Sequence, residues 1–270
     1  MDAENIRAGF DISRPISNTL RIHKNLPLLQ WTQIIMMKFS SLVFTLALLV
    51  SGSGLAQTDI TRSAELGALL TSGNTDEQNL NFGAEVEIEQ TDWNYLFSVN
   101  GLYAQSEGVV KAQRVVGIGR ANYEITEYSF FQTRASHEDD RFNGFDSQSD
   151  ITFSYGRDFL LNQPNMDLSL VGGIGARYSR LDDGSTKEEP ILRLAGEYDW
   201  NLSETALFSQ DLSVDAGSNS DIYRSESSIE TQILGNLSLR FTVRIRHQTE
   251  VPVGRKNTDT QTAITFNMEF

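Results

Sequence analysis

The feature that most constrains this chain is an alternation of apolar and polar residues, which runs from about residue 62 to residue 270. In the last segment, Phe266, Met268 and Phe270 alternate with polar side chains. A period of two is the pattern of a β-strand, whose successive side chains point to opposite faces. No comparable stretch has the period of an amphipathic helix, so we predict an all-β fold.

The alternating segments are long for strands. We predict about twelve of them, at residues 62–72, 76–89, 93–105, 110–124, 128–139, 146–160, 167–181, 189–200, 205–216, 224–235, 237–249 and 259–270. Strands of soluble proteins usually have about five or six residues, whereas a tilted strand needs roughly 9–11 residues to cross a bilayer. The lengths therefore favour an antiparallel, up-and-down transmembrane β-barrel.

The connections between these strands also follow a pattern. One set is short, at residues 90–92, 125–127, 161–166, 201–204 and 234–237, and the other tends to be longer and more charged, at residues 139–145, 182–188, 217–223 and 250–258. Transmembrane barrels have short periplasmic turns and longer outer loops. Aromatic residues such as Trp93, Tyr123 and Trp200 gather beside the short set, as expected of an interfacial girdle.

A soluble sandwich or lipocalin-like barrel is the rival fold, and its apolar face would point inward. Alternation alone does not decide which face is inside. Strand length, the aromatic residues beside the short turns and the charged opposite face together favour the membrane barrel, with hydrocarbon against the apolar side.

The N-terminal region has the three parts of a secretory signal peptide. In residues 37–56, Lys38 precedes an apolar run of about twelve residues, and small residues follow at Gly54 and Ala56. The run is shorter than the roughly 17–25 residues of a membrane-spanning helix. We therefore expect cleavage after Ala56, a barrel over residues 57–270 and a location in the outer membrane.

Residues 1–36 precede this segment, although signal peptides begin at the N-terminus. We expect translation to start at Met36 or Met37. The 36 residues would then be an extension outside the fold, either mis-assigned to the chain or disordered, and we assign it no function.

Composition excludes several functions. The chain has no cysteine, three histidines and a formal net charge of −14. These counts exclude a disulfide scaffold, a cysteine nucleophile and a thiolate metal site, and the acidity argues against nucleic-acid binding, which requires a basic face. We expect no cofactor and no bound metal.

Several segments resemble one known family. They are Ala64–Asn74 (AELGALLTSGN), Trp93–Tyr95, Asn100–Tyr103, Phe130–Phe142 and Gly172–Tyr178 (GGIGARY). The chain is similar, over nearly all of residues 62–270, to the salt-induced outer-membrane proteins. This resemblance implies an outer-membrane β-barrel of unassigned function, and it carries no functional residue to this chain.

The polar face of the predicted strands carries charges of both signs. The candidate charge network of the lumen is Glu226, Glu230, Arg240, Arg244, Arg246, Arg193 and Glu197. Because the strands at 224–235 and 237–249 are adjacent, their glutamates and arginines are expected to form cross-strand ion pairs. The network either braces the barrel as a structural component of the envelope or lines a narrow passive channel for ions and small polar solutes, where an acidic excess favours cations.

An outer-membrane hydrolase is the alternative, with His137 and His247 near the predicted outer mouth. Acid–base catalysis needs such groups within hydrogen-bond reach of one another, and their strands are far apart in a twelve-stranded ring. We therefore do not expect an enzyme. The partners expected are outer-membrane lipid, lipopolysaccharide and the barrel-assembly machinery, and the sequence leaves the oligomeric state open.

Overall fold

Long antiparallel strands make up most of the described chain. The structure is a computed structural model that describes residues 58–71, 77–140 and 145–270. The strands are β1 (Asp59–Thr71), β2 (Glu77–Glu89), β3 (Trp93–Ser106), β4 (Val109–Thr126), β5 (Ser129–Asp140), β6 (Phe145–Phe159), β7 (Met166–Leu181), β8 (Thr186–Ser203), β9 (Ala206–Gly217), β10 (Ile222–Leu234), β11 (Leu237–Gln248) and β12 (Thr258–Glu269). Within these ranges, no helix is long and apolar enough to cross a membrane. The predicted signal peptide and N-terminal extension lie outside the described residues.

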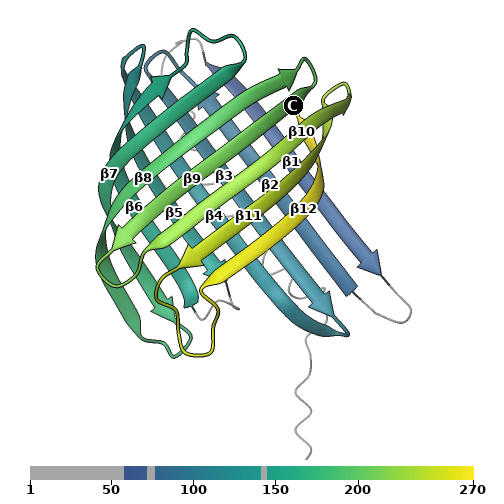
Figure 1. The fold of residues 1–270 in the computed structure, drawn as a ribbon, viewed down its shortest axis with the longest axis vertical. Coiled ribbons are helices and arrows are strands. Elements are labelled where there is room, and N and C mark those ends of the chain that lie inside the picture. Colours follow the sequence, from purple (N-terminus) through teal and green to yellow (C-terminus); the bar gives the residue numbers. More distant parts are fainter. Residues whose placement is uncertain (1–57, 72–76, 141–144) are drawn as a thin grey trace, which may run out of the picture. The chain divides into compact units, whose positions relative to one another are not determined.

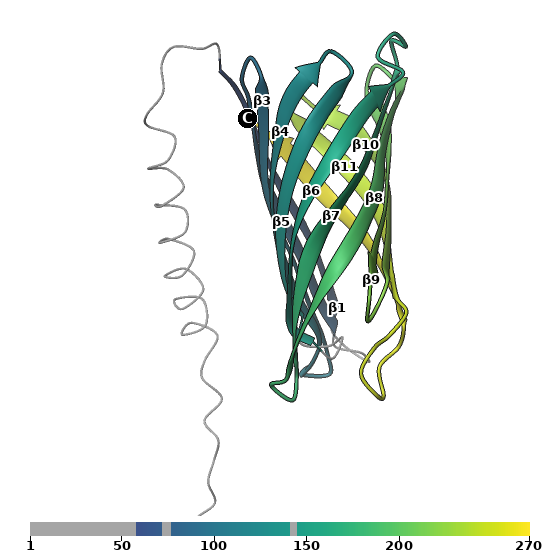
Figure 2. The ribbon, with the colours of Figure 1, turned by 90° about the vertical axis from the view of Figure 1, so that its left-hand side faces the viewer.

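The strands close into a single ring. Each strand pairs with its neighbours in the chain, and β1 pairs with β12, as Figures 1 and 2 show. Every pair is antiparallel, so the topology is up-and-down. The predicted all-β barrel is confirmed, with twelve strands whose ends lie within three residues of the predicted ones.

The alternation sorts side chains between the outside and the inside of the ring. Large apolar residues such as Leu170, Ile174 and Phe266 are exposed on the outer face. Most of the buried side chains are polar or charged, including Thr152, Arg177 and Asp215, whereas few apolar side chains are buried. The barrel is therefore inverted relative to a soluble protein, which buries its apolar residues.

The two ends of the barrel differ in their connections. At the end that carries Phe270, which we call the turn end, the connections between the strands are residues 90–92, 127–128, 160–165, 204–205 and 235–236. The opposite loop end carries the described connections 107–108, 182–185, 218–221 and 249–257. The connection at Glu107 and Gly108 is shorter than the predicted pattern, because both residues have positive φ and close a two-residue hairpin.

Aromatic side chains gather at the turn end. Trp93 stacks on Tyr95 with ring centroids 5.7 Å apart and lies 5.0 Å from Tyr123. The guanidinium of Arg157 lies 5.8 Å from the ring centroid of Phe159 on the outer surface. This arrangement resembles the aromatic girdles of transmembrane barrels at the membrane–water interface.

Candidate functional site: a charged lumen

Two of the predicted ion pairs join directly opposed residues on β10 and β11. Arg244 donates two hydrogen bonds to Glu226, at 2.7 and 2.9 Å. Arg240 donates to Glu230 at 2.7 Å and reaches Glu65 on β1 at 3.5 Å. The β10–β11 register places each arginine opposite its glutamate, so these contacts follow from strand pairing alone.

The other predicted network residues have different partners. Arg193 on β8 donates at 2.7 Å to Asp215, its register partner on β9. Arg246 is opposite Arg224 and not a carboxylate, and Arg224 instead binds Asp215. Glu197 binds neither Arg193 nor any residue of β10 or β11. The seven predicted residues therefore do not form one network.

Near the loop end, Arg246 crosses the lumen. Its Nη2 donates to Gln148 on β6 at 2.5 Å, and its Nη1 lies 3.9 Å from Glu138 on β5. β5 and β11 are six positions apart in a ring of twelve, so they face each other across the barrel. Glu138 also accepts a hydrogen bond from Arg114 at 2.9 Å. A bridge of side chains therefore crosses the lumen at this level.

A second group of buried charges lies at the loop end on the neighbouring strands β7, β8 and β9. Arg177 donates to Glu189 at 3.1 Å and to the backbone oxygens of Ser220 and Asp215. Glu189 also accepts from the backbone nitrogen of Asn219 at 2.7 Å. The side chains of Arg177 and Glu189 are 2% and 5% exposed, so a pair shielded from solvent holds the 218–221 connection.

The turn-end half of the lumen is more open. Arg120 on β4 donates to Glu197 on β8 at 2.6 Å, across four positions of the ring. Their side chains are 19% and 47% exposed. Beside this bridge lies a cavity of about 180 Å³, lined by Glu87, Asn94, Arg120, Asn122, Glu124, Phe130, Gln132, Asp158, Ser169, Val171, Ala195 and Glu197. Its four carboxylates outnumber its single arginine.

Polar atoms in this cavity lack protein partners. Among the described residues, the side-chain oxygens of Asn94 and Asn122 and the Nε of Arg120 are buried without a hydrogen bond. Asn94 uses its amide nitrogen to donate to Glu87 at 2.8 Å. Buried polar groups are normally satisfied by protein or by ordered water. The cavity is therefore built for water or a polar solute.

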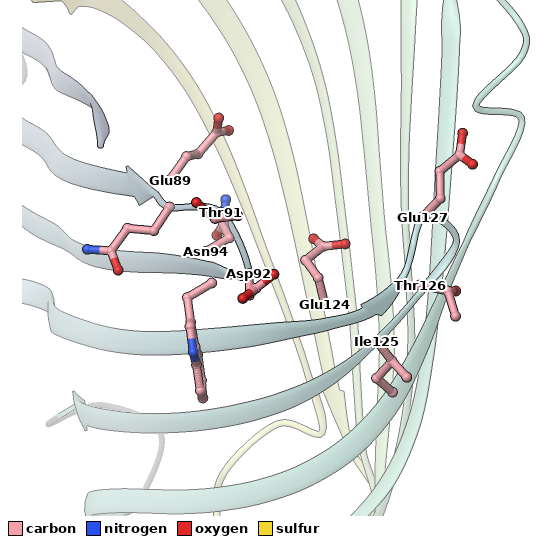
Figure 3. Close-up of a pocket in the computed structure, with 10 residues that line it drawn as sticks. Glu89, Thr91, Asp92, Asn94, Glu124, Ile125, Thr126 and Glu127 are labelled. Carbon is pink, nitrogen blue, oxygen red and sulfur yellow. The ribbon is translucent and has the colours of Figure 1, made fainter. Parts of the chain in front are cut away.

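The cavity continues to the rim of the barrel. A second pocket of about 510 Å³ shares Asn94 and Glu124 with it and adds the carboxylates of Glu89, Asp92 and Glu127. Figure 3 shows these side chains at the ends of β2, β3 and β4 and on the turns that precede β3 and follow β4. We call the two pockets together the turn-end vestibule. In the described part of the chain, no group of three histidine, aspartate or glutamate side chains could hold a metal ion.

The histidines of the hydrolase hypothesis lie far apart. The Nδ1 atom of His137 lies 2.8 Å from the hydroxyl of Ser149 on the neighbouring strand β6. The Nδ1 atom of His247 lies 2.8 Å from the hydroxyl of Thr258 on the neighbouring strand β12. Their chain neighbours Glu138 and Arg246 point into the lumen, so His137 and His247 lie on the outer face of opposite walls. These two side chains therefore cannot share one catalytic site.

Sequence reasoning missed several lumen residues. Arg134, Glu138 and Arg224 form ion pairs inside the barrel, although none of them was among the seven residues of the predicted charge network. Arg224 has the same parity as Glu226, so strict alternation would have placed it inside. In β5 the adjacent Phe130 and Phe131 obscure the alternation; the structure buries the first and exposes the second.

The fold and the lumen define a class. This is an up-and-down β-barrel with an apolar outer surface and a charged interior, which is the construction of a transmembrane barrel. The chain belongs to the family described as "Protein of unknown function, DUF481", which matches residues 64–270. That description mentions no salt response, so this part of the resemblance stays a prediction.

One curated relative is the uncharacterized protein YdiY of Escherichia coli K12. It is 27% identical over 203 residues, which cover 74% of this chain and 79% of the relative. The match thus extends over most of both chains, but the relative's name assigns no activity.

Solved structures with a similar outline are also barrels. The translocator domain of the autotransporter NalP from Neisseria meningitidis is 10% identical, covers 89% of this chain and 97% of its own, and has a TM-score of 0.46. The NanC porin is 8% identical, with coverage of 78% and 97% and a TM-score of 0.45. The KdgM porin is 10% identical, with coverage of 79% and 99% and a TM-score of 0.44. Likeness of this degree gives no information on what this barrel binds.

Proposed function

We propose that this protein is an outer-membrane barrel that acts as a narrow passive channel for small cations and small polar solutes. The observation that carries the proposal is the turn-end vestibule, which is acidic, has unsatisfied polar atoms and ends at the half-exposed Arg120–Glu197 bridge. An inert barrel could fill this space with apolar side chains, because replacing buried ion pairs by packed apolar groups is often neutral or stabilising.

The preference for cations follows from the charge of the vestibule. Glu87, Glu124, Asp158 and Glu197 line the inner cavity, and only Arg120 opposes them. A low-dielectric wall focuses the field of such a cluster and raises the local concentration of counter-ions. We place the turn end in the periplasm because short turns are periplasmic in barrels of this type.

A structural role in the envelope is the second candidate. The densely paired loop end favours it, since Arg177, Glu189 and Asp215 are almost fully buried. A barrel held shut there would add rigidity to the membrane and pass no solute. Interactions with lipopolysaccharide and with the assembly machinery belong to both candidates.

Planar bilayer recordings of purified protein distinguish the two. The channel proposal expects small, stable conductance steps, with a reversal potential in a KCl gradient that indicates a preference for K⁺ over Cl⁻. Silence across several salts would refute the channel and leave the structural role. A reversal potential on the anion side would refute the assignment of cations.

A further inference from the structure

We propose that the seam between β1 and β12 is a lateral opening that admits an amphiphile with an uncharged, hydroxyl-rich head. Its alkyl chain would stay in the membrane while its head reaches the lumen. The inference rests on the membrane location proposed above and adds a second route, sideways through the barrel.

The seam has the shortest strand pairing of the ring. β1 and β12 are in register over four residue pairs, from Ser63–Glu269 to Leu66–Phe266. The other neighbouring strands pair over ten to fifteen. Beyond Leu66, β1 continues through Thr71 and remains paired with β2, as Gly67 does with Asn81. β12 likewise remains paired with β11 as far as Thr258.

Figure 1 shows the consequence, since β1 and β12 diverge towards the loop end. Gly67 still lies close to β12, since a Cβ there would lie 2.6 Å from the backbone oxygen of Ile264. Unpaired strand edges are excluded from hydrocarbon, because bare backbone groups find no hydrogen-bond partner there. In the described part of the chain no strand pairs with these edges, so water or a polar head group would satisfy them.

Side chains inside the barrel bridge part of the seam. Thr265 donates to Glu65, and Gln261 on β12 donates to Asn81 on β2 at 2.8 Å, passing beyond β1. These are contacts between side chains, which can exchange for solute hydroxyls without breaking a strand ladder. The seam can thus open without unfolding a neighbouring hairpin.

The chemistry on the two sides of the seam differs. On the outer surface, Leu66, Ile264 and Phe266 are exposed apolar side chains. On the inner side, Asn81 and Gln261 present amides, and Asn100 lies near Gly83 with its side-chain oxygen 2.9 Å from the position of a Cβ. Amides donate and accept hydrogen bonds, as sugar hydroxyls do. An alkyl chain with a sugar-like head matches both sides.

The opening can be tested with cysteine pairs, because the chain has no native cysteine. The seam pair is Leu70→Cys with Thr262→Cys, which would be partners if the register of Leu66–Phe266 continued four residues further along each strand. The matched control is Ala64→Cys with Met268→Cys, which are register partners. Mild oxidation in native membranes should join the control pair and leave the seam pair reduced, at less than about a tenth of the control rate, because disulfides require close Cα atoms. Equal cross-linking of the two pairs would show a closed seam and overturn the proposal.

The ligand is tested by photolabelling in proteoliposomes. The probe is dodecyl maltoside with a diazirine in its head, and the comparators are maltose with the same diazirine and a dodecyl sulfate analogue. Labelling of peptides that carry Asn81 or Gln261 by the maltoside alone is the expected result. Equal labelling by free maltose would mean entry along the lumen, and preferential labelling by the sulfate would mean a charged head; either result contradicts the proposal. Neither test measures conductance. A barrel that conducts no ions would therefore refute the channel proposal and leave the seam proposal standing.

Discussion

The guanidinium of Arg120 on β4 lies 2.6 Å from the carboxylate of Glu197 on β8, although four positions of the ring separate the two strands. The contact therefore spans the lumen and does not follow the wall. Because Glu197 is 47% exposed, water reaches this pair from the turn-end vestibule. The bridge is the inner boundary of that vestibule.

The exposure of this bridge predicts a small effect on stability. Ion pairs in contact with water contribute about 0–1 kcal/mol, so Arg120→Ala should lower the free energy of unfolding by no more than about 1 kcal/mol. Urea titrations followed by heat-modifiable gel mobility measure this. A loss of several kcal/mol would show that the bridge braces the barrel.

The buried pair at the loop end should behave differently. Glu189→Ala removes the carboxylate that pairs with the Arg177 side chain, which is 2% exposed. Breaking a buried pair costs about 3–5 kcal/mol, because the remaining charge is left without its partner. The same urea titration should show this loss. A stability equal to that of Arg120→Ala would mean that water enters the loop end.

Which side chains of β7 face lipid and which face the lumen can be tested by substituting two neighbouring residues. Leu170 is exposed on the outer surface directly opposite Arg157, so an arginine there would place two like charges side by side on the lipid-facing surface, which is destabilising. Ser169 lines the vestibule near Asp158 and Glu197, so an arginine there meets carboxylates. Leu170→Arg should reduce the folded fraction in outer-membrane extracts, and Ser169→Arg should not. Equal effects would contradict the inverted arrangement.

Glycine at one inward position is required by close backbone approach. A Cβ at Gly173 would lie 2.2 Å from the backbone oxygen of Phe153, whereas one at Gly117 would meet nothing within 4 Å. Overpacking costs about 1–3 kcal/mol. Gly173→Ala should therefore destabilise the barrel by roughly this amount, and Gly117→Ala should leave the urea midpoint unchanged. Equal midpoints for the two variants would show that β6 and β7 can separate at no cost.

The twelve strands, their facing and the Arg240–Glu230 and Arg244–Glu226 pairs could be predicted because they depend on local order. Alternation assigns the face, and a hairpin register sets which residues are opposite. Arg246 shows where this reasoning ends. Its register partner is Arg224, so its guanidinium turns across the lumen to Gln148, on a strand five positions away.

Contacts across the lumen depend on the diameter and stagger of the closed ring, which no single strand encodes. Glu197 was a candidate, but its partner Arg120 lies 77 residues earlier in the chain and four positions away in the ring. The short β1–β12 seam was equally inaccessible, since it results from how the accumulated stagger closes the ring.

The most direct test of the central claim is the single-channel conductance of Arg120→Ala compared with the wild type in planar bilayers. Because the contacts of Arg246 also cross the lumen at the loop end, removal of the Arg120 guanidinium should raise the conductance only modestly, but it should strengthen the preference for K⁺ because the carboxylates of the vestibule then lack their opposing charge. An unchanged preference for K⁺, or silence in both proteins, would contradict a cation path that passes this bridge.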